Sequence, residues 1–189
     1  MMYFAPTRLR LALALGAGLL ALNASAADTA KPANAKIQRG HYLVVTAGCM
    51  DCHTPLKMGP NGPEPDLSRN LSGHPEGMQM PPAPAASGPW MIGAAGTLTA
   101  WYGPWGTSFT ANLTPDMETG IGKWTLDDFK ATLRSGRHLG KGRPVLPPMP
   151  IGATSKMTDA DLEAIFAYLR SIPAVKNRVP DARPPLAAQ

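Results

Sequence analysis

The sequence has few cysteines, little charge and no long apolar run after its first 27 residues. Only two of its 189 residues are cysteine, and Asp, Glu, Lys and Arg together make up 16% of the chain. Basic residues number 18 against 13 acidic ones, and no run of basic residues occurs. This mild excess does not indicate nucleic-acid binding, but it is compatible with docking onto an acidic face of a partner protein. No internal repeat is visible.

The start of the chain has the pattern of a secretory signal peptide. A basic head carrying Arg8 and Arg10 precedes the apolar run Leu11–Leu22, and Ala24 and Ala26 form an A-x-A cleavage pattern. The apolar run has 12 residues, whereas a membrane-spanning helix needs roughly 20. The pattern therefore predicts export with cleavage, and an uncleaved N-terminal anchor is the alternative.

Cleavage would leave a mature protein of about 163 residues (189 − 26), within the usual range for one domain. Both arginines of the leader would be lost, so 16 basic residues would face 13 acidic ones, a net charge of about +3. We expect residues 1–26 to be the signal peptide, residues 27–36 to be a linker, and the mature protein to be periplasmic. No other segment is apolar enough to cross a membrane.

Three segments have the pattern of helices. One is expected from about Asn34 to Gly48, although its apolar periodicity is imperfect. A second should begin after the cap residue Thr125 and stop at Gly136, and a third should begin after Thr158 and end at Pro173. The apolar residues that follow helical spacing in the third segment are Leu162, Ile165, Phe166 and Leu169.

Proline, glycine and small residues dominate the sequence between the first two helices. From Thr54 to Trp90 this composition excludes a helix or a central strand, so we expect an irregular wrap or partial disorder. The segment Thr97–Asn112 alternates Thr and Ser with larger residues around a Gly-Pro-Trp-Gly turn, which predicts a small β-hairpin. Gly40 should let the first and last helices cross closely. These elements bury little surface for their length, which predicts a large apolar ligand at the centre.

Both cysteines lie in the stretch Cys49-Met50-Asp51-Cys52-His53. C-x-x-C-H is the signature for attachment of c-type haem. On one helical turn, residues i and i+3 present both sulfurs to the same side, where they can form thioethers with the two vinyl groups of the porphyrin. The histidine, one residue further, can then coordinate the iron. The motif predicts one covalently attached haem c, with Cys49 and Cys52 as its attachment sites and His53 as an iron ligand.

Three other interpretations of this motif are weaker. A thioredoxin-like dithiol should follow a strand in a βαβ unit, whereas here a helix precedes the motif and Pro-rich coil follows it. A zinc site needs four ligands, and the remaining histidines, His41, His74 and His138, occur singly. A disulfide between these two cysteines would close too small a loop to stabilise the fold much.

A second axial ligand is expected for an electron-carrying haem, and methionine suits this role because its thioether favours reduced iron. Met149 lies in "RPVLPPMPIG", where the flanking prolines restrict the backbone and can hold the sulfur rigidly. Met80, in "MQMPPAP", has similar surroundings and is the second candidate. Met58 follows His53 too closely to reach the opposite face of the haem. The sixth position could instead be open or bound by a histidine.

The haem propionates would also need polar partners. Candidates are Arg137, Arg143, Trp101, Trp105 and Tyr102. Each of these residues is more often a surface charge or a core aromatic, and His138 is more readily explained as a solvated loop residue than as a ligand. The sequence therefore does not assign the propionate contacts.

Three stretches resemble the haem domains of the cytochrome c family: "RGHYLVVTAGCMDCHTP", "TANLTPDMETGIGKWTLDDFKATLRSGRH" and "PPMPIGATSKMTDADLEAIFAYLRSIPAVKNRVP". They are most similar to the repeated domains of the cytochrome c subunits that serve membrane-associated alcohol and aldehyde dehydrogenases. The resemblance covers roughly residues 37–180 and implies an all-α cytochrome c fold. It also implies Cys49 and Cys52 as thioether sites, His53 as proximal ligand and Met149 as distal ligand.

This sequence departs from that family pattern in two ways. The dehydrogenase subunits carry several haem motifs, whereas this chain has one, so we expect a monohaem module. Its Pro/Gly-rich section also looks long. We therefore expect an all-α cytochrome c domain over residues 37–180, with an irregular insertion at about residues 55–96, a small β-hairpin, and a C-terminal tail over residues 181–189 that is extended or loose.

The function expected from these features is that of a periplasmic c-type cytochrome carrying single electrons, not an enzyme. Its partners would be redox proteins, such as a dehydrogenase, another cytochrome or a terminal oxidase. No nucleic acid or small-molecule substrate is expected, and membrane contact should occur only through partners. Two further hypotheses are a haem enzyme or gas sensor with an open sixth position, and a structural subunit docked permanently to a dehydrogenase.

Overall fold

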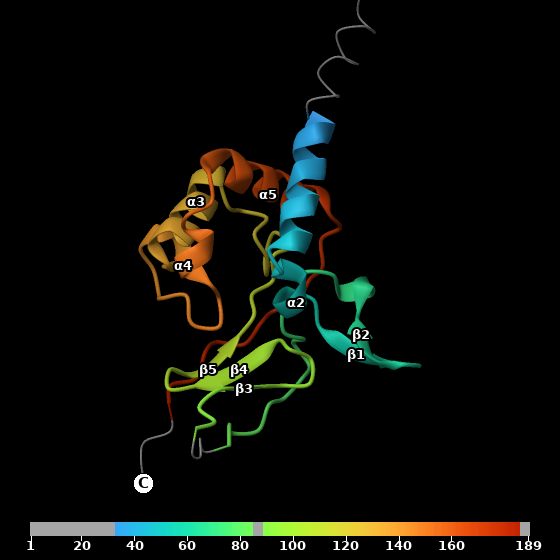
Figure 1. Cartoon of the computed structure of the whole chain (residues 1–189), viewed down its shortest axis with the longest axis vertical. Helices are drawn as coiled ribbons and strands as arrows, with labels where there is room; N and C mark the ends of the chain where they lie inside the picture. The colour runs from blue at the N-terminus through green and yellow to red at the C-terminus, as the bar shows by residue number, and fades with distance from the viewer. Residues whose placement is uncertain (1–32, 85–88, 186–189) are drawn as a thin grey trace, which may run out of the picture. The chain divides into compact units, whose positions relative to one another are not determined.

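The structure is a computed structural model that describes residues 33–84 and 89–185 (Figure 1). The chain divides into two units, and the second, Ile37–Gln189, contains all the elements discussed below except the first four residues of the first helix. The signal peptide expected over residues 1–26 lies outside the described residues. The last residues of the expected linker, 33–36, are already helical. Within the described ranges, no helix combines the length and apolar character needed to span a membrane.

Helices lie toward both ends of the described chain, and all the strands lie between them. The first helix is described over residues 33–46. The elements that follow are α2 (Cys49–His53), β1 (Leu56–Gly59), β2 (Gly62–Pro65), the 3-10 turn η1 (Leu67–Arg69), β3 (Gly93–Ala94), β4 (Ala100–Gly103), β5 (Gly106–Phe109), α3 (Leu126–Ser135), the 3-10 turn η2 (His138–Gly140), α4 (Ile151–Thr154) and α5 (Asp159–Ser171).

The caps expected for the second and third helices are present. At α3, Thr125 Oγ1 accepts from the Asp128 backbone N–H at 3.1 Å, and the Asp128 carboxylate accepts from the Thr125 N–H at 3.0 Å. This is a complete capping box. At α5, Thr158 accepts from the Asp161 N–H at 3.1 Å, while the Asp161 carboxylate pairs with Arg39 of the first helix at 2.9 Å.

The first helix crosses α5 at Gly40, as the sequence predicted. A Cβ added at Gly40 would overlap the carbonyl oxygen of Ala164 and lie 2.8 Å from the Cβ of Tyr168. Only glycine therefore permits this approach. The crossing brings the two helices onto one core, formed with α3 and the segment before it. The buried apolar residues of that core are Val44, Leu71, Ile121, Phe129, Leu133, Leu162, Ile165 and Leu169.

The prediction of an all-α fold is wrong, because the described residues also form two antiparallel sheets. One pairs β1 with β2, and the other has the order β3-β4-β5. The first sheet lies inside the segment expected to be irregular. Pro63 lies opposite Met58 and Pro65 opposite Leu56. A two-stranded sheet tolerates these prolines, because each strand is an edge and a proline can turn its missing donor away from its partner.

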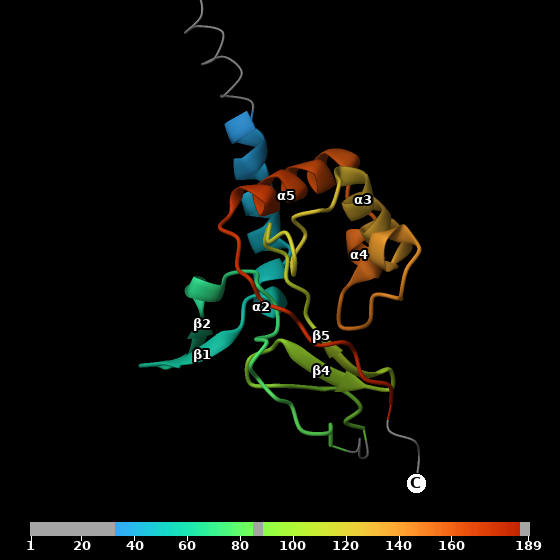
Figure 2. The ribbon, with the colours of Figure 1, turned by 180° about the vertical axis from the view of Figure 1, so that it is seen from behind.

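The hairpin expected around the Gly-Pro-Trp-Gly turn is confirmed. β4 pairs with β5 from Ala100 opposite Phe109 to Gly103 opposite Gly106. The tail, expected to be extended or loose, is extended at Arg183, which exchanges two backbone hydrogen bonds with Thr107 at 2.8 and 2.9 Å. Figure 2 shows this C-terminal segment (red) running from α5 to the three-stranded sheet. The helical core and the sheet are therefore joined by the chain's last described residues.

Candidate haem site

The two cysteines lie on the single turn of α2, directly after the first helix. Gly48 separates the two helices with a left-handed φ of 70°, a conformation that suits glycine. Both thiols are free and partly buried. Burial raises the pKa of Cys52, and the nearby Asp51 carboxylate adds to that rise; burial also raises the pKa of Cys49. Neutral thiols are the opposite of what a redox dithiol requires.

His53 ends the same turn and is buried. Its Nδ1 lies 2.8 Å from the backbone carbonyl oxygen of Ala111, which follows β5. Because a carbonyl can only accept, this contact places the ring proton on Nδ1 and leaves the lone pair on Nε2. Burial lowers the pKa of His53, so the ring is neutral at pH 7. An imidazole in this state can bind a metal through Nε2.

Met149 lies in the segment between η2 and α4, far from α2 in sequence. It is partly buried and packs against the same apolar core as Cys49. Two contacts hold this segment in place. Ser108 of β5 donates to the carbonyl oxygen of Pro147 at 2.6 Å, and the Val145 N–H donates to the Gly136 carbonyl oxygen at 2.8 Å. The fold thus brings the Met149 segment and the α2 turn to one core.

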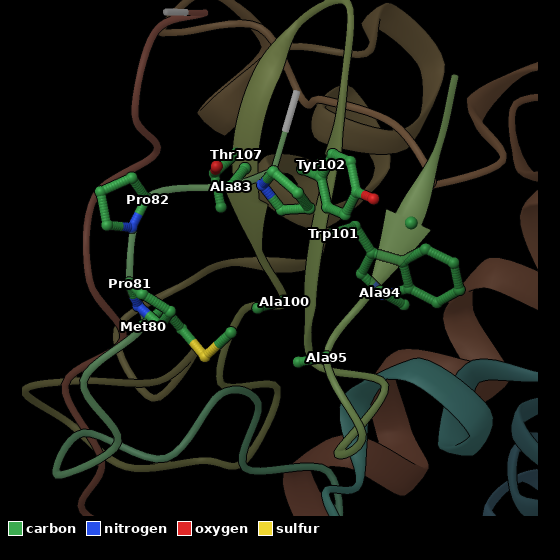
Figure 3. A pocket seen from close by; sticks show the side chains of 12 residues that line it. Met80, Pro81, Pro82, Ala83, Ala94, Ala95, Ala100, Trp101, Tyr102 and Thr107 are labelled. Carbon is green, nitrogen blue, oxygen red and sulfur yellow. The ribbon is translucent and has the colours of Figure 1, made fainter. Parts of the chain in front are cut away.

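The other methionine candidates lie elsewhere. Met80 lines a separate cavity of about 270 Å³ beside the three-stranded sheet. Figure 3 shows it with Pro81 and Pro82 on one side of that cavity, while Trp101 and Tyr102 come from strand β4. Met58, on β1, is 77% exposed. Neither residue belongs to the apolar core that Cys49 and Met149 share.

The remaining histidines have other contacts. Both ring nitrogens of His74 are engaged, with Thr99 Oγ1 at 3.0 Å and with the Met78 carbonyl oxygen at 3.2 Å. The His41 ring contacts the Tyr168 ring of α5 in a tilted arrangement at 5.0 Å, and His138 meets Trp124 edge to face at 5.2 Å. Among the described residues, no group of three His, Cys, Asp or Glu side chains is placed to hold a metal ion. A zinc site therefore has no support in this part of the chain.

The residues proposed to contact the haem propionates differ in whether their donor groups already have partners. The indole N–H of Trp101 donates to the Leu98 carbonyl oxygen at 2.8 Å, and that of Trp105 donates to Ser108 Oγ at 3.3 Å. Both tryptophan donors are therefore already used by residues close to them in the chain. Arg137 and Arg143 are exposed. The Ala111 carbonyl oxygen, which accepts from His53 Nδ1, could not be predicted from the sequence, because every residue type carries a backbone carbonyl.

The residues present fit a c-type haem. Two neutral thiols lie three residues apart on one helical turn, and a buried imidazole has its Nε2 lone pair free. A methionine from a separate segment packs on the same core as the first thiol. This is the donor set that covalent attachment and iron coordination need. The roles of Cys49, Cys52, His53 and Met149 in that set stay predictions.

Comparisons with known proteins agree with a c-type haem site. A family model for cytochrome c matches residues 37–173. The chain is 30% identical over 178 residues to the cytochrome c subunit of alcohol dehydrogenase (quinone) from Gluconobacter oxydans (strain 621H), covering 93% of this chain and 30% of that protein. It is 29% identical over 150 residues to the fructose dehydrogenase cytochrome subunit from Gluconobacter japonicus, covering 76% and 24%.

A third relative is the gluconate 2-dehydrogenase cytochrome c subunit from Pantoea cypripedii, which is 30% identical over 156 residues, covering 82% of this chain and 27% of that protein. The chain thus spans less than a third of the length of these relatives. The family match covers most of the chain, and its cofactor, one covalently bound haem c, agrees with the C-x-x-C-H spacing of α2. The resemblance seen in the sequence is confirmed: this chain belongs to the cytochrome c family.

Proposed function

We propose that this protein is a periplasmic carrier of single electrons between a dehydrogenase or another redox enzyme and the respiratory chain. In this proposal Cys49 and Cys52 attach the haem, while His53 and Met149 are its axial ligands. The relatives support a dehydrogenase partner, since they are cytochrome subunits of alcohol, fructose and gluconate dehydrogenases. The N-terminal signal pattern supports export.

The bound haem would supply a one-electron iron couple, and the protein's residues would set the conditions for it. The Ala111 carbonyl holds the His53 ring by Nδ1, which fixes its orientation toward the iron. The prolines around Met149 restrict its backbone, and its soft thioether would favour ferrous iron. His53 is buried and Met149 packs on the apolar core, and limited water access of this kind would also tune the potential. No substrate needs to be bound for this function.

One observation carries the proposal. Met149 packs on the same core as Cys49, whereas Met80 lies in a separate cavity and Met58 is exposed. Met50 and Met157 also pack on this core, but Met50 lies inside the attachment motif and only Met149 lies in a proline-rich segment. A sulfur on the shared core can close the sixth position of the iron. A closed position favours electron transfer, while a haem enzyme or gas sensor needs an open one.

An optical spectrum of the purified mature protein tests this directly. Ferric protein should show the weak deep-red charge-transfer band of iron–methionine ligation, and ferrous protein should not bind carbon monoxide. Free binding of carbon monoxide would instead support the haem enzyme or sensor. The mass of the same sample tests export: a mature N-terminus near Ala27 is expected, and retention of Leu11–Leu22 would favour a membrane anchor.

A further inference from the structure

The positive charge of this chain is concentrated in the segment that carries Met149. Residues 129–158 contain no Asp or Glu. Their basic residues are Lys130, Arg134, Arg137, Lys141, Arg143 and Lys156. These six charges exceed the net charge of the whole chain, +5, so the rest of the chain has a net charge of −1 (5 − 6). The excess of basic residues is therefore local.

Within this segment, residues 136–143 form what we call the basic loop. Its cations Arg137, Lys141 and Arg143 are all exposed. None of the three forms an ion pair with a carboxylate of the described residues. The cations of α3 differ, because Lys130 and Arg134 both pair with Asp159. Hydrogen bonds from Thr125 lower the pKa of Asp128, and the nearby charge of Lys141 adds to this effect. The basic loop thus presents Arg137 and Arg143 to solvent without an ion-paired carboxylate among the described residues, and Lys141 with only a distant one.

The basic loop is held in one conformation by backbone hydrogen bonds. The His138 N–H donates to the Arg143 carbonyl oxygen at 2.9 Å, and the Gly142 N–H donates to the His138 carbonyl oxygen at 2.7 Å. From α3, Thr132 Oγ1 accepts from the Leu139 N–H at 2.9 Å. These bonds fix the backbone from which the cations project, so a partner would meet a surface that is largely preformed.

Leu139 lies at the centre of the basic loop in an unusual conformation. Its φ is 52°, in the left-handed region, and its side chain is 37% exposed. This backbone conformation is less favourable in energy for leucine than for glycine or asparagine. Here the strained residue presents an apolar side chain between three cations.

The basic loop also leads directly to the predicted iron ligand. Its base is closed by a bridge between Arg137 and Pro144, and by the bond from Val145 N–H to the Gly136 carbonyl oxygen. Met149 follows four residues after that second contact. Burial lowers the pKa of His138, and the charge of Arg143 adds to this effect, consistent with a positive field. A partner bound at the basic loop would therefore contact the segment that leads to Met149, the residue that would hold the iron in the proposed function.

We propose that the basic loop is the docking surface for an acidic face of the protein that exchanges electrons with the haem. This inference rests on the proposed function. Exposed cations without partners steer an acidic protein into encounter and fix its orientation, with an effect on the association rate more than on affinity. Leu139 supplies an apolar contact at the centre of the patch, where interfaces exclude water.

The test uses the holoprotein and reduced flavodoxin, an acidic single-electron donor, as the probe. The variant Arg137→Gln/Lys141→Gln/Arg143→Gln should reduce the second-order rate of haem reduction about tenfold at low ionic strength. A control matched in charge and exposure, Lys57→Gln/Lys176→Gln/Arg178→Gln, removes three exposed cations elsewhere, of which Lys57 and Lys176 are ion-paired, and should change the rate less than about twofold. The difference in rate between the two variants should disappear at about 0.5 M salt, where charges are screened. The spectra of both variants should match that of the wild type.

Equal slowing in both variants would show that only overall charge matters, and no slowing in the loop variant would remove the docking role; either result overturns the inference. Leu139→Ala should lower the rate by a few-fold, with the loss persisting in high salt because an apolar contact is not screened. The results that would overturn the docking inference differ from the results that would overturn the proposed function. In the latter case wild-type haem would bind carbon monoxide freely or would accept no electron from the probe.

Discussion

At the residue scale, a backbone carbonyl prepares the buried histidine for coordination. The Ala111 oxygen lies 2.8 Å from His53 Nδ1, and the two residues are 58 positions apart. The neighbouring Gly73 has no room for a Cβ, because the carbonyl oxygens of Thr110 and Ala111 crowd it. Its N–H donates to the His53 carbonyl oxygen at 2.8 Å. The segment after β5 is thus packed tightly against the α2 turn, which keeps the Ala111 acceptor in place.

A methionine substitution tests the predicted ligand set. Met149→Ala should abolish the deep-red charge-transfer band of the ferric protein and allow carbon monoxide to bind the ferrous protein. It should also lower the reduction potential, by on the order of 0.1 V within the roughly 0.8 V range that axial ligands set, because loss of the soft sulfur stabilises ferric iron. Optical spectroscopy with redox titration measures all three properties.

Met80→Ala is the matched control, because it removes the other proline-flanked thioether from a cavity away from the shared core. It should leave the band, the carbon monoxide response and the potential nearly unchanged. If Met80→Ala loses the band while Met149→Ala keeps it, the ligand assignment is wrong but the carrier function stands. If neither variant changes anything and wild-type protein binds carbon monoxide, the carrier function fails.

The donor atoms of the site could be predicted from the sequence, but their supports could not. Cysteine, histidine and methionine have chemistry that their spacing and proline context reveal. The acceptor for His53 is a backbone carbonyl, and the anchor of the Met149 segment is the hydroxyl of Ser108. Both depend on where β5 lies in three dimensions. No local pattern encodes such a long-range contact.

At the element scale, the helices that begin at a side-chain cap could be predicted from the sequence, whereas the proline-containing strands β1 and β2 could not. Thr125 with Asp128, and Thr158 before an amphipathic run, mark helix starts that the structure confirms. The strands β1 and β2 were missed because proline normally argues against strands, while an isolated two-stranded sheet accepts it at an edge. The helix α4 was missed as well: its four residues carry a glycine and follow a proline, so its stability comes from tertiary packing.

The crossing of the first helix over α5 yields a stability prediction. Gly40→Ala should lower the free energy of unfolding by about 1–3 kcal/mol or more, because its Cβ would overlap the Ala164 carbonyl and the helices would have to separate. Urea denaturation followed by circular dichroism measures this loss. Gly152→Ala, in helix α4, is the control, since a methyl group added at Gly152 would have no heavy atom within 4 Å to clash with.

Alanine has a higher helix propensity than glycine, so Gly152→Ala should be neutral or stabilising, by up to about 1 kcal/mol. Equal stability of the Gly40→Ala protein and the wild type would mean that the two helices do not approach closely at Gly40. A large loss in the Gly152→Ala control would instead indicate a general intolerance of substitution, and the crossing would no longer explain the first result.

At the scale of the whole molecule, the core is small for the length of the chain. Only eight buried apolar residues form its main cluster in the described ranges. Several residues around that cluster, including Cys49, Met149 and Trp124, are only partly buried. A porphyrin attached at α2 would add a large apolar surface to this cluster. Its burial is favourable at about 25 cal/mol per Å², so the holoprotein should be much more stable than the apoprotein.

Removal of the attachment sites tests this dependence. Cys49→Ala and Cys52→Ala should each weaken haem retention through denaturing electrophoresis, and the double variant should retain none. The double variant, purified without haem, should unfold more than about 10 °C below the holoprotein, since each kcal/mol lost shifts the midpoint by about 2–4 °C at this size. Haem added to it without covalent attachment should restore part of the midpoint, because His53 and Met149 are still present to bind iron. This recovery separates the loss of the cofactor from the loss of two thiols. Haem-free protein that unfolds as cooperatively and as late as the holoprotein would show that the polypeptide alone completes its core.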